Sequence, residues 1–181
     1  MRKKNKSSLI ATFLTLFIIP LSVNNFSLSC KPDLNKSVED EFQKTISISA
    51  PIELEINISQ GNINITRGND KELKINSKYK VLGTKEEELK IIAENIKKDP
   101  PIDIKSNKIK IGNLKKYNID VWFSEEKVIM DLDILTPVGT TVTAETGLGN
   151  VNITSLASDV KVITGLGGVK IENTKSADVK T

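Results

Sequence analysis

Apolar and polar residues alternate along the chain from residue 46 onward. Apolar side chains occupy every even position from Ile46 to Ile58, a period of two that only an extended strand places on one face. Pro51 marks a break or an edge, because it cannot donate a ladder hydrogen bond. The parity changes after Gly61, since the next apolar residues, at 63 and 65, are odd. The chain must turn or bulge there to return them to the interior.

Similar runs predict two hairpins farther along the chain. The first joins residues 102–104 to residues 109–111 through a turn at 106–108. The second joins residues 119–123 to residues 128–134. In this second hairpin Asp131 and Asp133 share the face opposite the apolar row. They could contribute to a calcium or sugar site, but we favour a solvated face because no further oxygen ligands lie nearby in sequence.

One segment, residues 84–98, departs from the strand pattern. Thr84 and Glu87 have the spacing of a capping box, in which the two side chains satisfy free N–H groups at the start of a helix. Leu89 and Ile96, with the alanine between them, recur at helical spacing on one face. Two prolines follow at 100 and 101 and forbid continuation. We therefore predict one helix that starts at Thr84.

The last third of the chain is a repeat. Thr146-Gly-Leu-Gly-Asn-Val-Asn-Ile returns eighteen residues later as Thr164-Gly-Leu-Gly-Gly-Val-Lys-Ile, and Asp159-Val-Lys returns nineteen residues later at Asp178. Such a short period predicts stacked rungs that share a ladder, because one unit cannot bury its own apolar face. Glycines are expected at the rung corners, where positive φ is required. These structural glycines are Gly61, Gly147, Gly149, Gly165, Gly167 and Gly168.

The same unit occurs earlier in the chain. Gly61-Asn-Ile-Asn-Ile-Thr parallels Gly149-Asn-Val-Asn-Ile-Thr, and Gly167 to Ile171 follows the pattern with glycine in place of the polar residue. Over residues 46–181, the ordered set of units resembles the putative adhesin family of bacterial β-strand repeat proteins. That resemblance implies a mainly β fold, a β-solenoid or β-roll of short stacked rungs with one inserted α-helix. It also implies a role in adhesion.

The first 29 residues have the layout of an export signal. Four basic residues precede an apolar run from Leu9 to Val23, which contains Pro20. A membrane-spanning helix needs about 20 apolar residues, so we predict a cleaved signal peptide over residues 1–29 rather than a permanent span. The mature chain should begin at Cys30, the single cysteine.

This segment resembles a bacterial lipoprotein signal. The resemblance implies a lipid on the Cys30 sulfur, a tether over residues 30–44 and a β-strand repeat domain over residues 45–181. Of the three positions before the cysteine only Ser29 fits a lipobox cleanly, so the alternative is a soluble exported protein with a free thiol. We favour lipidation, because it removes a lone exposed thiol from an oxidising compartment.

Charge and composition exclude several functions. Without the signal, 22 basic residues face 23 acidic ones, and the lysines are interleaved with acids, so no nucleic-acid footprint is expected. The chain has no histidine, which excludes imidazole-based triads and histidine-ligated metal sites. Neither glycine-rich phosphate motif occurs. We therefore expect no enzyme, no cofactor and no metal site.

The pattern as a whole predicts an exported, non-catalytic envelope lipoprotein in the outer membrane or at the cell surface. It would present its β-solenoid to a protein or glycan ligand. One alternative is a structural envelope protein that self-associates through a strand edge of its terminal rung. Another is a carbohydrate-binding module, which would require Trp122 on one surface with Asp131 and Asp133. The last unit stops at Thr181, earlier than the preceding one, so we interpret the sequence as truncated with further rungs missing.

Overall fold

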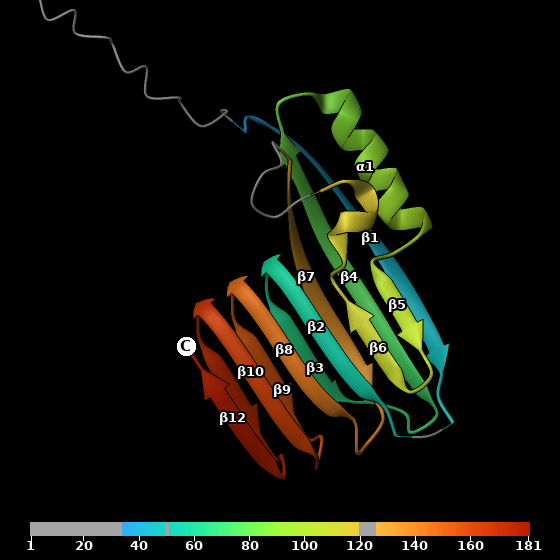
Figure 1. The fold of residues 1–181 in the computed structure, drawn as a ribbon, viewed down its shortest axis with the longest axis vertical. Helices are drawn as coiled ribbons and strands as arrows, with labels where there is room; N and C mark the ends of the chain where they lie inside the picture. Colours follow the sequence, from blue (N-terminus) through green and yellow to red (C-terminus); the bar gives the residue numbers. More distant parts are fainter. Residues whose placement is uncertain (1–33, 50, 120–125) are drawn as a thin grey trace, which may run out of the picture. The chain divides into compact units, whose positions relative to one another are not determined.

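The computed structural model describes residues 34–49, 51–119 and 126–181, which form a mainly β fold with two mixed sheets (Figure 1). The first sheet has six strands in the order β1 (Lys36–Ser47), β4 (Glu72–Gly83), β7 (Lys127–Thr136), β3 (Ile63–Arg67), β9 (Val151–Thr154) and β11 (Val169–Glu172). The second has six in the order β12 (Ser176–Lys180), β10 (Asp159–Leu166), β8 (Thr141–Leu148), β2 (Glu53–Gln60), β6 (Lys108–Ile111) and β5 (Ile102–Lys105). The helix α1 (Glu86–Lys98) and the 3-10 helix η1 (Leu114–Tyr117) complete the described elements.

The inward side chains of both sheets and of α1 form one hydrophobic core. Leu54 and Ile56 of β2 and Ile63 and Ile65 of β3 are fully buried. The change of parity at Gly61 is therefore a corner, where the chain passes from the second sheet to the first. As an upper estimate, burying each such side chain contributes about 1.5 to 3 kcal/mol.

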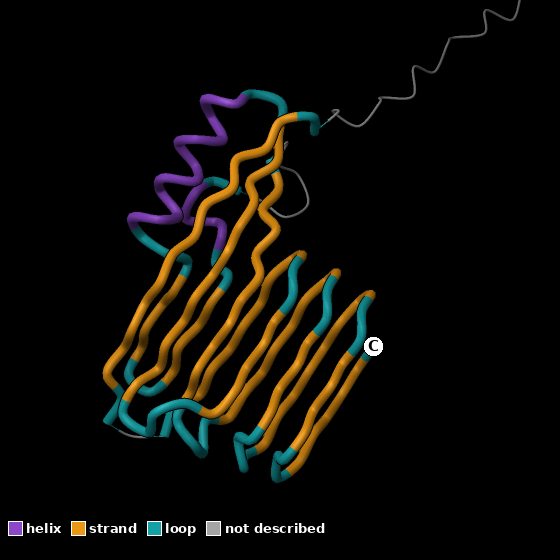
Figure 2. The backbone as a smooth tube through the Cα atoms, turned by 180° about the vertical axis from the view of Figure 1, so that it is seen from behind, coloured by secondary structure: helices purple, strands orange, loops and turns teal. Residues whose placement is uncertain are grey.

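Three strand pairs, β2–β3, β8–β9 and β10–β11, stack on one another in parallel register (Figure 2). Val142 lies opposite Val160 and Val151 lies opposite Val169, which confirms the predicted spacing of 18 residues. Ile63 also lies opposite Val151, so residues 61–66 are an earlier copy of the same unit, as predicted.

The predicted match of Asp159 with Asp178 is wrong. In the parallel pair of β10 and β12, Asp159 lies opposite Ser176 and Lys161 lies opposite Asp178. The offset between these strands is thus 17 residues. Either odd offset keeps the inward residues of the two strands on one face, and the observed one places Val162 beside Val179.

The predicted tether is wrong over most of its length. Residues 36–44 belong to β1, whose twelve residues pair antiparallel with β4. The folded part therefore begins well before Thr45. Val38 and Phe42 point inward, but Asp40 lies between them and interrupts the apolar pattern that would have revealed a strand.

The alternating run from Ile46 to Ile58 is divided between two strands. β1 ends at Ser47 in the first sheet and β2 starts at Glu53 in the second, so the predicted break near Pro51 is confirmed. The first sheet continues with antiparallel pairing of β4 to both β1 and β7. Stacked repeat units thus form only part of the fold.

The helix is confirmed, but its predicted start is wrong. α1 starts at Glu86, and its N-cap Lys85 makes no side-chain capping hydrogen bond. Glu87 instead pairs with Lys90 at 3.2 Å. Leu89 and Ile96 are fully buried as predicted, and acidic residues in the first turn complement the helix dipole without a capping box.

The first predicted hairpin is confirmed, with β5 and β6 pairing antiparallel. Of the second, residues 120–125, which include Trp122, lie outside the described residues. The predicted strand at 128–134 is part of β7, in which Val128, Met130, Leu132 and Ile134 are buried as predicted and Asp131 and Asp133 are exposed. In the described residues β7 lies between β4 and β3.

Candidate interaction surface

Two rows of polar side chains cross the outer face of the first sheet, from β7 through β3 to β9; we call them the amide ladders. In the first row, the backbone N–H of Asn62 donates to Asp131 Oδ1 at 2.7 Å, and Asn62 Nδ2 donates to the same oxygen at 3.0 Å. The backbone N–H of Asn150 donates to Asn62 Oδ1 at 3.0 Å, and that of Gly168 donates to Asn150 Oδ1 at 2.8 Å. Each rung therefore supplies an acceptor for the next.

The second amide ladder runs beside the first. Asn64 Nδ2 donates to Asp133 Oδ1 at 2.9 Å, and Asn152 Nδ2 donates to Asn64 Oδ1 at 2.9 Å. The two aspartates that the sequence placed on a solvated face thus begin the two ladders. Within the described residues, no group of three or more histidine, cysteine or acidic side chains could hold a metal ion.

The amide ladders stop at β11. Gly168 and Lys170 occupy the positions that asparagines hold in the two preceding units, and Glu172 occupies the position of Thr154. Lys170 Nζ lies 3.1 Å from Glu172 Oε1 on the same strand. The last described strand of the first sheet therefore presents opposite charges where earlier strands present amides and hydroxyls.

The predicted glycines lie at the corners that hold these strands in place. Gly61, Gly149 and Gly167 have φ values of +131°, +149° and +152°. A Cβ on Gly149 would meet the carbonyl oxygen of Gly61 at 1.9 Å, and one on Gly167 would meet that of Gly149 at 1.9 Å. The glycines therefore allow adjacent rungs to approach closely.

The other predicted glycines stand beside the corners. A Cβ on Gly147 would meet the carbonyl oxygen of Ser59 at 2.6 Å, one on Gly165 would meet that of Gly147 at 2.7 Å, and one on Gly168 would meet Asn150 Oδ1 at 3.2 Å. The role of the threonine that precedes each Gly-Leu-Gly motif was not predicted from the sequence. Thr146 Oγ1 donates to the Gly61 carbonyl at 3.2 Å, and Thr164 Oγ1 donates to the Gly149 carbonyl at 3.3 Å. The recurrence of this threonine in both copies of the repeat could have indicated its role.

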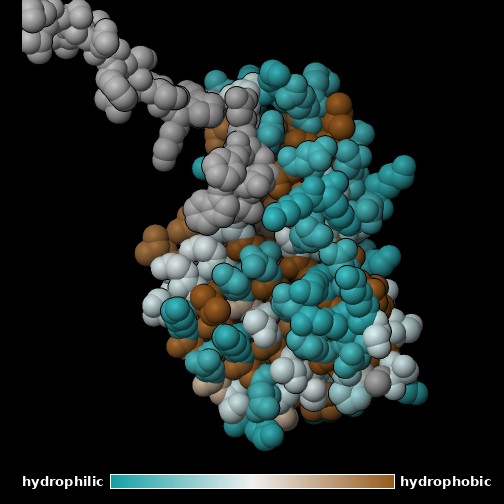
Figure 3. Space-filling model, viewed as in Figure 1, coloured by the Kyte–Doolittle hydropathy of each residue, from teal (hydrophilic) through white to brown (hydrophobic). Residues whose placement is uncertain are grey.

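Exposed leucines lie where β8 and β10 end. Leu148 and Leu166 are register partners on these adjacent parallel strands, so they lie side by side, and they are 43% and 72% exposed. Figure 3 shows apolar side chains at this margin of the molecule. A groove of about 850 Å³ adjoins it and is lined in part by Leu148, Ile58 and Ile119.

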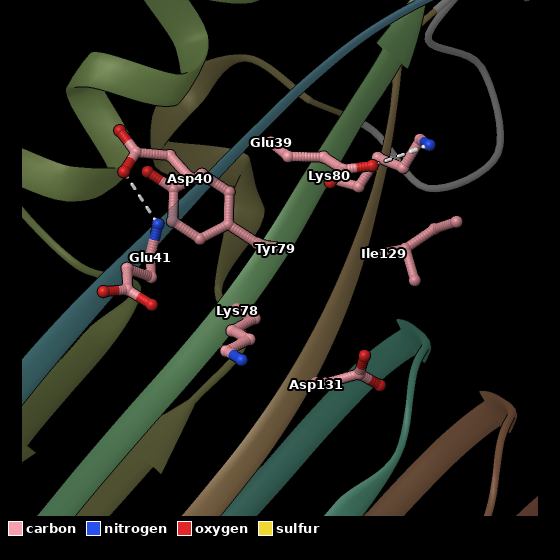
Figure 4. A pocket seen from close by; sticks show the side chains of 8 residues that line it. All are labelled: Glu39, Asp40, Glu41, Lys78, Tyr79, Lys80, Ile129 and Asp131. Carbon is pink, nitrogen blue, oxygen red and sulfur yellow. Dashed lines mark hydrogen bonds and ion pairs between the residues drawn. The ribbon is translucent and has the colours of Figure 1, made fainter.

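A second hollow of about 460 Å³ lies across β1, β4 and β7 (Figure 4). Lys80 Nζ donates to Glu39 Oε1 at 2.9 Å, and this hydrogen bond lowers the pKa of Glu39. Lys97 donates to Asp40 Oδ1 at 2.8 Å and lowers the pKa of Asp40 in the same way. Both carboxylates are thus held ionised by lysine partners.

The second sheet carries a row of ion pairs on its outer face. Lys108 Nζ lies 2.7 Å from Glu53 and 2.9 Å from Glu55, and Lys110 Nζ lies 2.9 Å from the other Glu55 oxygen. These lysines lower the pKa of Glu55 through hydrogen bonds.

In the described residues, no helix is long and apolar enough to cross a membrane. Cys30, the predicted lipidation site, lies outside the described residues.

Comparison with known proteins finds similarity in structure only. No protein-family model and no curated protein matches the chain. A solved structure described as a putative adhesin from Bacteroides fragilis NCTC 9343 aligns with 76% of this chain at 19% identity and a TM-score of 0.37. The chain spans 65% of that protein's length. A putative cell adhesion protein from Clostridium sporogenes ATCC 15579 aligns with 78% of this chain and 99% of its own at 13% identity and a TM-score of 0.27.

Proposed function

We propose that this protein is a non-catalytic, exported envelope lipoprotein that binds a protein or glycan ligand through the outer face of its first sheet. The observation that carries the proposal is the pair of amide ladders. Their side chains stand in rows on a rigid strand scaffold, and each aspartate uses only one carboxylate oxygen in the ladder hydrogen bonds described above. The remaining oxygens and the exposed amides offer donors and acceptors in a fixed, repeating pattern.

The stacked units support a β-solenoid as the scaffold of this binding surface. The parallel register of β3 and β9 places identical outward residues side by side, with Asn64 beside Asn152 and Thr66 beside Thr154. A binding surface built this way gains contact area with each added unit. The asparagines of the second ladder, Asn64 and Asn152, lie within strands, so a ligand that binds them would meet little conformational adjustment.

The state of the ionisable groups supports binding rather than catalysis. The carboxylates with shifted pKa values, such as Glu39, Asp40 and Glu55, are shifted downward by exposed lysines. A general acid or base would instead need a pKa near the working pH. Tyr79 has its pKa raised by burial, and its hydroxyl is engaged by the backbone of α1.

Adhesion is tested with whole cells that display the full chain. Retention on surfaces coated with fibronectin, collagen or mucin is compared for wild type and the double variant Asn64→Ala with Asn152→Ala. We expect at least one coating to retain wild-type cells and to bind the variant about tenfold more weakly, because the two substitutions remove both amide side chains from the ladder face. The matched control, Thr143→Ala with Lys161→Ala, changes the outer face of the second sheet and should bind as wild type. Equal binding by cells without the protein on every coating would refute the proposal.

The anchor is tested separately by intact mass and detergent partitioning. Wild type should carry acyl mass at Cys30 and enter the detergent phase, and Cys30→Ala should lose both. An unmodified N-terminus in the aqueous phase for both proteins would leave a soluble exported protein with the same binding face.

A further inference from the structure

A groove lies in the second sheet where β6 ends. β6 pairs with residues 53–56 of β2, whereas β8 runs beside β2 as far as Gln60. After Ile111 the chain leaves the sheet and enters η1 (Figure 1). Among the described strands, the last residues of β2 therefore have a neighbour on one side only. The groove of about 850 Å³ lies along these residues.

Part of the groove lining is apolar. Ile58, Leu114 and Ile119 line it and belong to the hydrophobic core, so they reach the groove from the interior of the fold. Leu148 also lines the groove and is 43% exposed. Small-molecule sites are typically clefts of about 300–1,000 Å³ that combine such an apolar lining with a few polar groups. The size and lining of this groove therefore fit a small molecule.

Two amide–carboxylate pairs supply polar groups. Asn57 Nδ2 on β2 donates to Glu145 Oε2 on β8 at 3.2 Å. Asn113 Nδ2, two residues after the end of β6, donates to Asp103 Oδ2 on β5 at 3.0 Å. All four residues line the groove. Each hydrogen bond uses one carboxylate oxygen, so the other oxygen can accept a hydrogen bond from a ligand.

The charges along the groove nearly balance. Its lining holds three carboxylates, those of Glu55, Asp103 and Glu145, and two lysines, Lys110 and Lys115. Lys110 Nζ lies 2.9 Å from Glu55 Oε1, so this pair is neutral as a whole. An acidic ligand would meet the carboxylates, and a cationic ligand would meet the ammonium groups. The groove therefore suits an uncharged ligand that is rich in hydroxyl groups.

An extended peptide is a poor fit to this groove. A peptide that added a strand beside the end of β2 would need free backbone groups there. The backbone of Gly112 already occupies that place, because a Cβ on Gly112 would meet the carbonyl oxygen of Asn57 at 1.9 Å. The N–H of Gly112 in turn donates to the Pro101 carbonyl oxygen at 2.9 Å. The groove thus presents side chains rather than an open strand edge.

We propose that this groove binds a short neutral glycan, with a sugar ring against Ile58 and Leu148 and sugar hydroxyls donating to Glu145 and Asp103. The C–H groups of a pyranose ring form an apolar face, and its hydroxyls make strong hydrogen bonds to carboxylates. The site is built from the second sheet and the segment after β6, whereas the amide ladders belong to the first sheet. The proposal therefore does not depend on the binding role of the ladders.

Isothermal titration calorimetry of the exported full chain tests the site with maltose, cellobiose, lactose and diacetylchitobiose. We expect at least one disaccharide to bind with a Kd of about 1 mM or lower. Glu145→Gln should weaken that binding about tenfold, because an amide oxygen accepts a weaker hydrogen bond than a carboxylate. The matched control is Thr141→Ala, which changes an exposed residue of the same strand outside the groove and should bind as wild type.

Further comparisons separate this site from the ladder face and from charged ligands. The double variant Asn64→Ala with Asn152→Ala should keep the wild-type affinity, and a loss of binding there would place the glycan on the ladders instead. Sialyllactose, which is acidic, and chitobiose, which is cationic, should bind more weakly than lactose and diacetylchitobiose. Tighter binding of either charged sugar would contradict a neutral ligand. No binding of the four disaccharides, or equal affinity in Glu145→Gln and wild type, would overturn the proposal.

Discussion

The Tyr79 hydroxyl on β4 donates a hydrogen bond to the Ala93 carbonyl oxygen in the middle of α1, at 2.7 Å. The Tyr79 ring is buried and packs against Phe42 of β1, with ring centroids 6.1 Å apart. One side chain therefore joins the helix to two strands of the first sheet. Because burial disfavours the phenolate, it raises the pKa of Tyr79 and keeps the hydroxyl a donor.

Tyr79→Phe should lower the free energy of unfolding by about 1 kcal/mol, since it removes one buried hydrogen bond and keeps the ring contact. Urea denaturation of the full chain measures this. The slope of the transition should not change, because the surface exposed on unfolding is nearly the same. An unchanged midpoint would mean that the helix is held by its apolar face alone.

The lowered pKa of Asp40 leads to a prediction of how the stability of the folded state depends on pH. Its hydrogen bond from Lys97 lowers its pKa in the folded chain below the ordinary value of 3.8. A group whose folded pKa is lowered stabilises the protein above its unfolded pKa, and that stabilisation is lost as the pH falls through the folded value. Wild type should therefore lose stability on acidification from about pH 5 to pH 3 more steeply than Asp40→Asn.

Thermal unfolding of both proteins at several pH values tests this slope. Lys97→Met is the matched control, because it removes the cation and should flatten the same part of the profile. If neither variant changes the acid slope, the pair does not stabilise the folded state at neutral pH.

Local patterns predicted the parts of the fold that depend on neighbours in sequence. The alternation around Gly61 locates the corner, and the repeated motif gives the register between β9 and β11. The helix face with Leu89 and Ile96 follows from its period. Each of these signals is contained within one element or within copies of one motif.

The missed features depend on residues far apart in sequence. β1 escaped notice because the inward Asp40 finds its partner Lys97 only when α1 folds back over it. The amide ladders join Asn62 to Asp131, 69 residues away, so no local spacing indicates them. Which strands become neighbours decides these contacts, and a single sequence does not state that order.

Ser77 is a buried residue whose side chain is unfavourable where it lies. It is 2% exposed, lies opposite Phe42 and Leu132 in the two flanking ladders, and its hydroxyl makes no hydrogen bond within the described part of the chain. Ser77→Ala should raise the free energy of unfolding by about 1 kcal/mol, because it removes an unpaired polar group and creates little empty space. Urea denaturation measures the gain, and a loss of stability would show that the hydroxyl has a partner in solution.

The corner glycines should differ sharply from a glycine in open space. Gly149 has φ +149° and a Cβ there would lie 1.9 Å from the Gly61 carbonyl oxygen, whereas Gly139 has φ +80° with nothing within 4 Å of its Cβ position. Gly149→Ala must move one rung away from another and should cost more than about 3 kcal/mol. Gly139→Ala bears only the left-handed backbone cost of about 1 to 2 kcal/mol.

Urea denaturation and protease sensitivity of the two variants compare these costs directly. Gly149→Ala should be cleaved rapidly within the repeat at concentrations of protease that leave Gly139→Ala intact, because open rungs expose their strands. If both substitutions cost the same, the close approach of successive corners would not be what demands glycine, and backbone conformation alone would explain its recurrence. The difference between the two variants therefore isolates the contact between rungs.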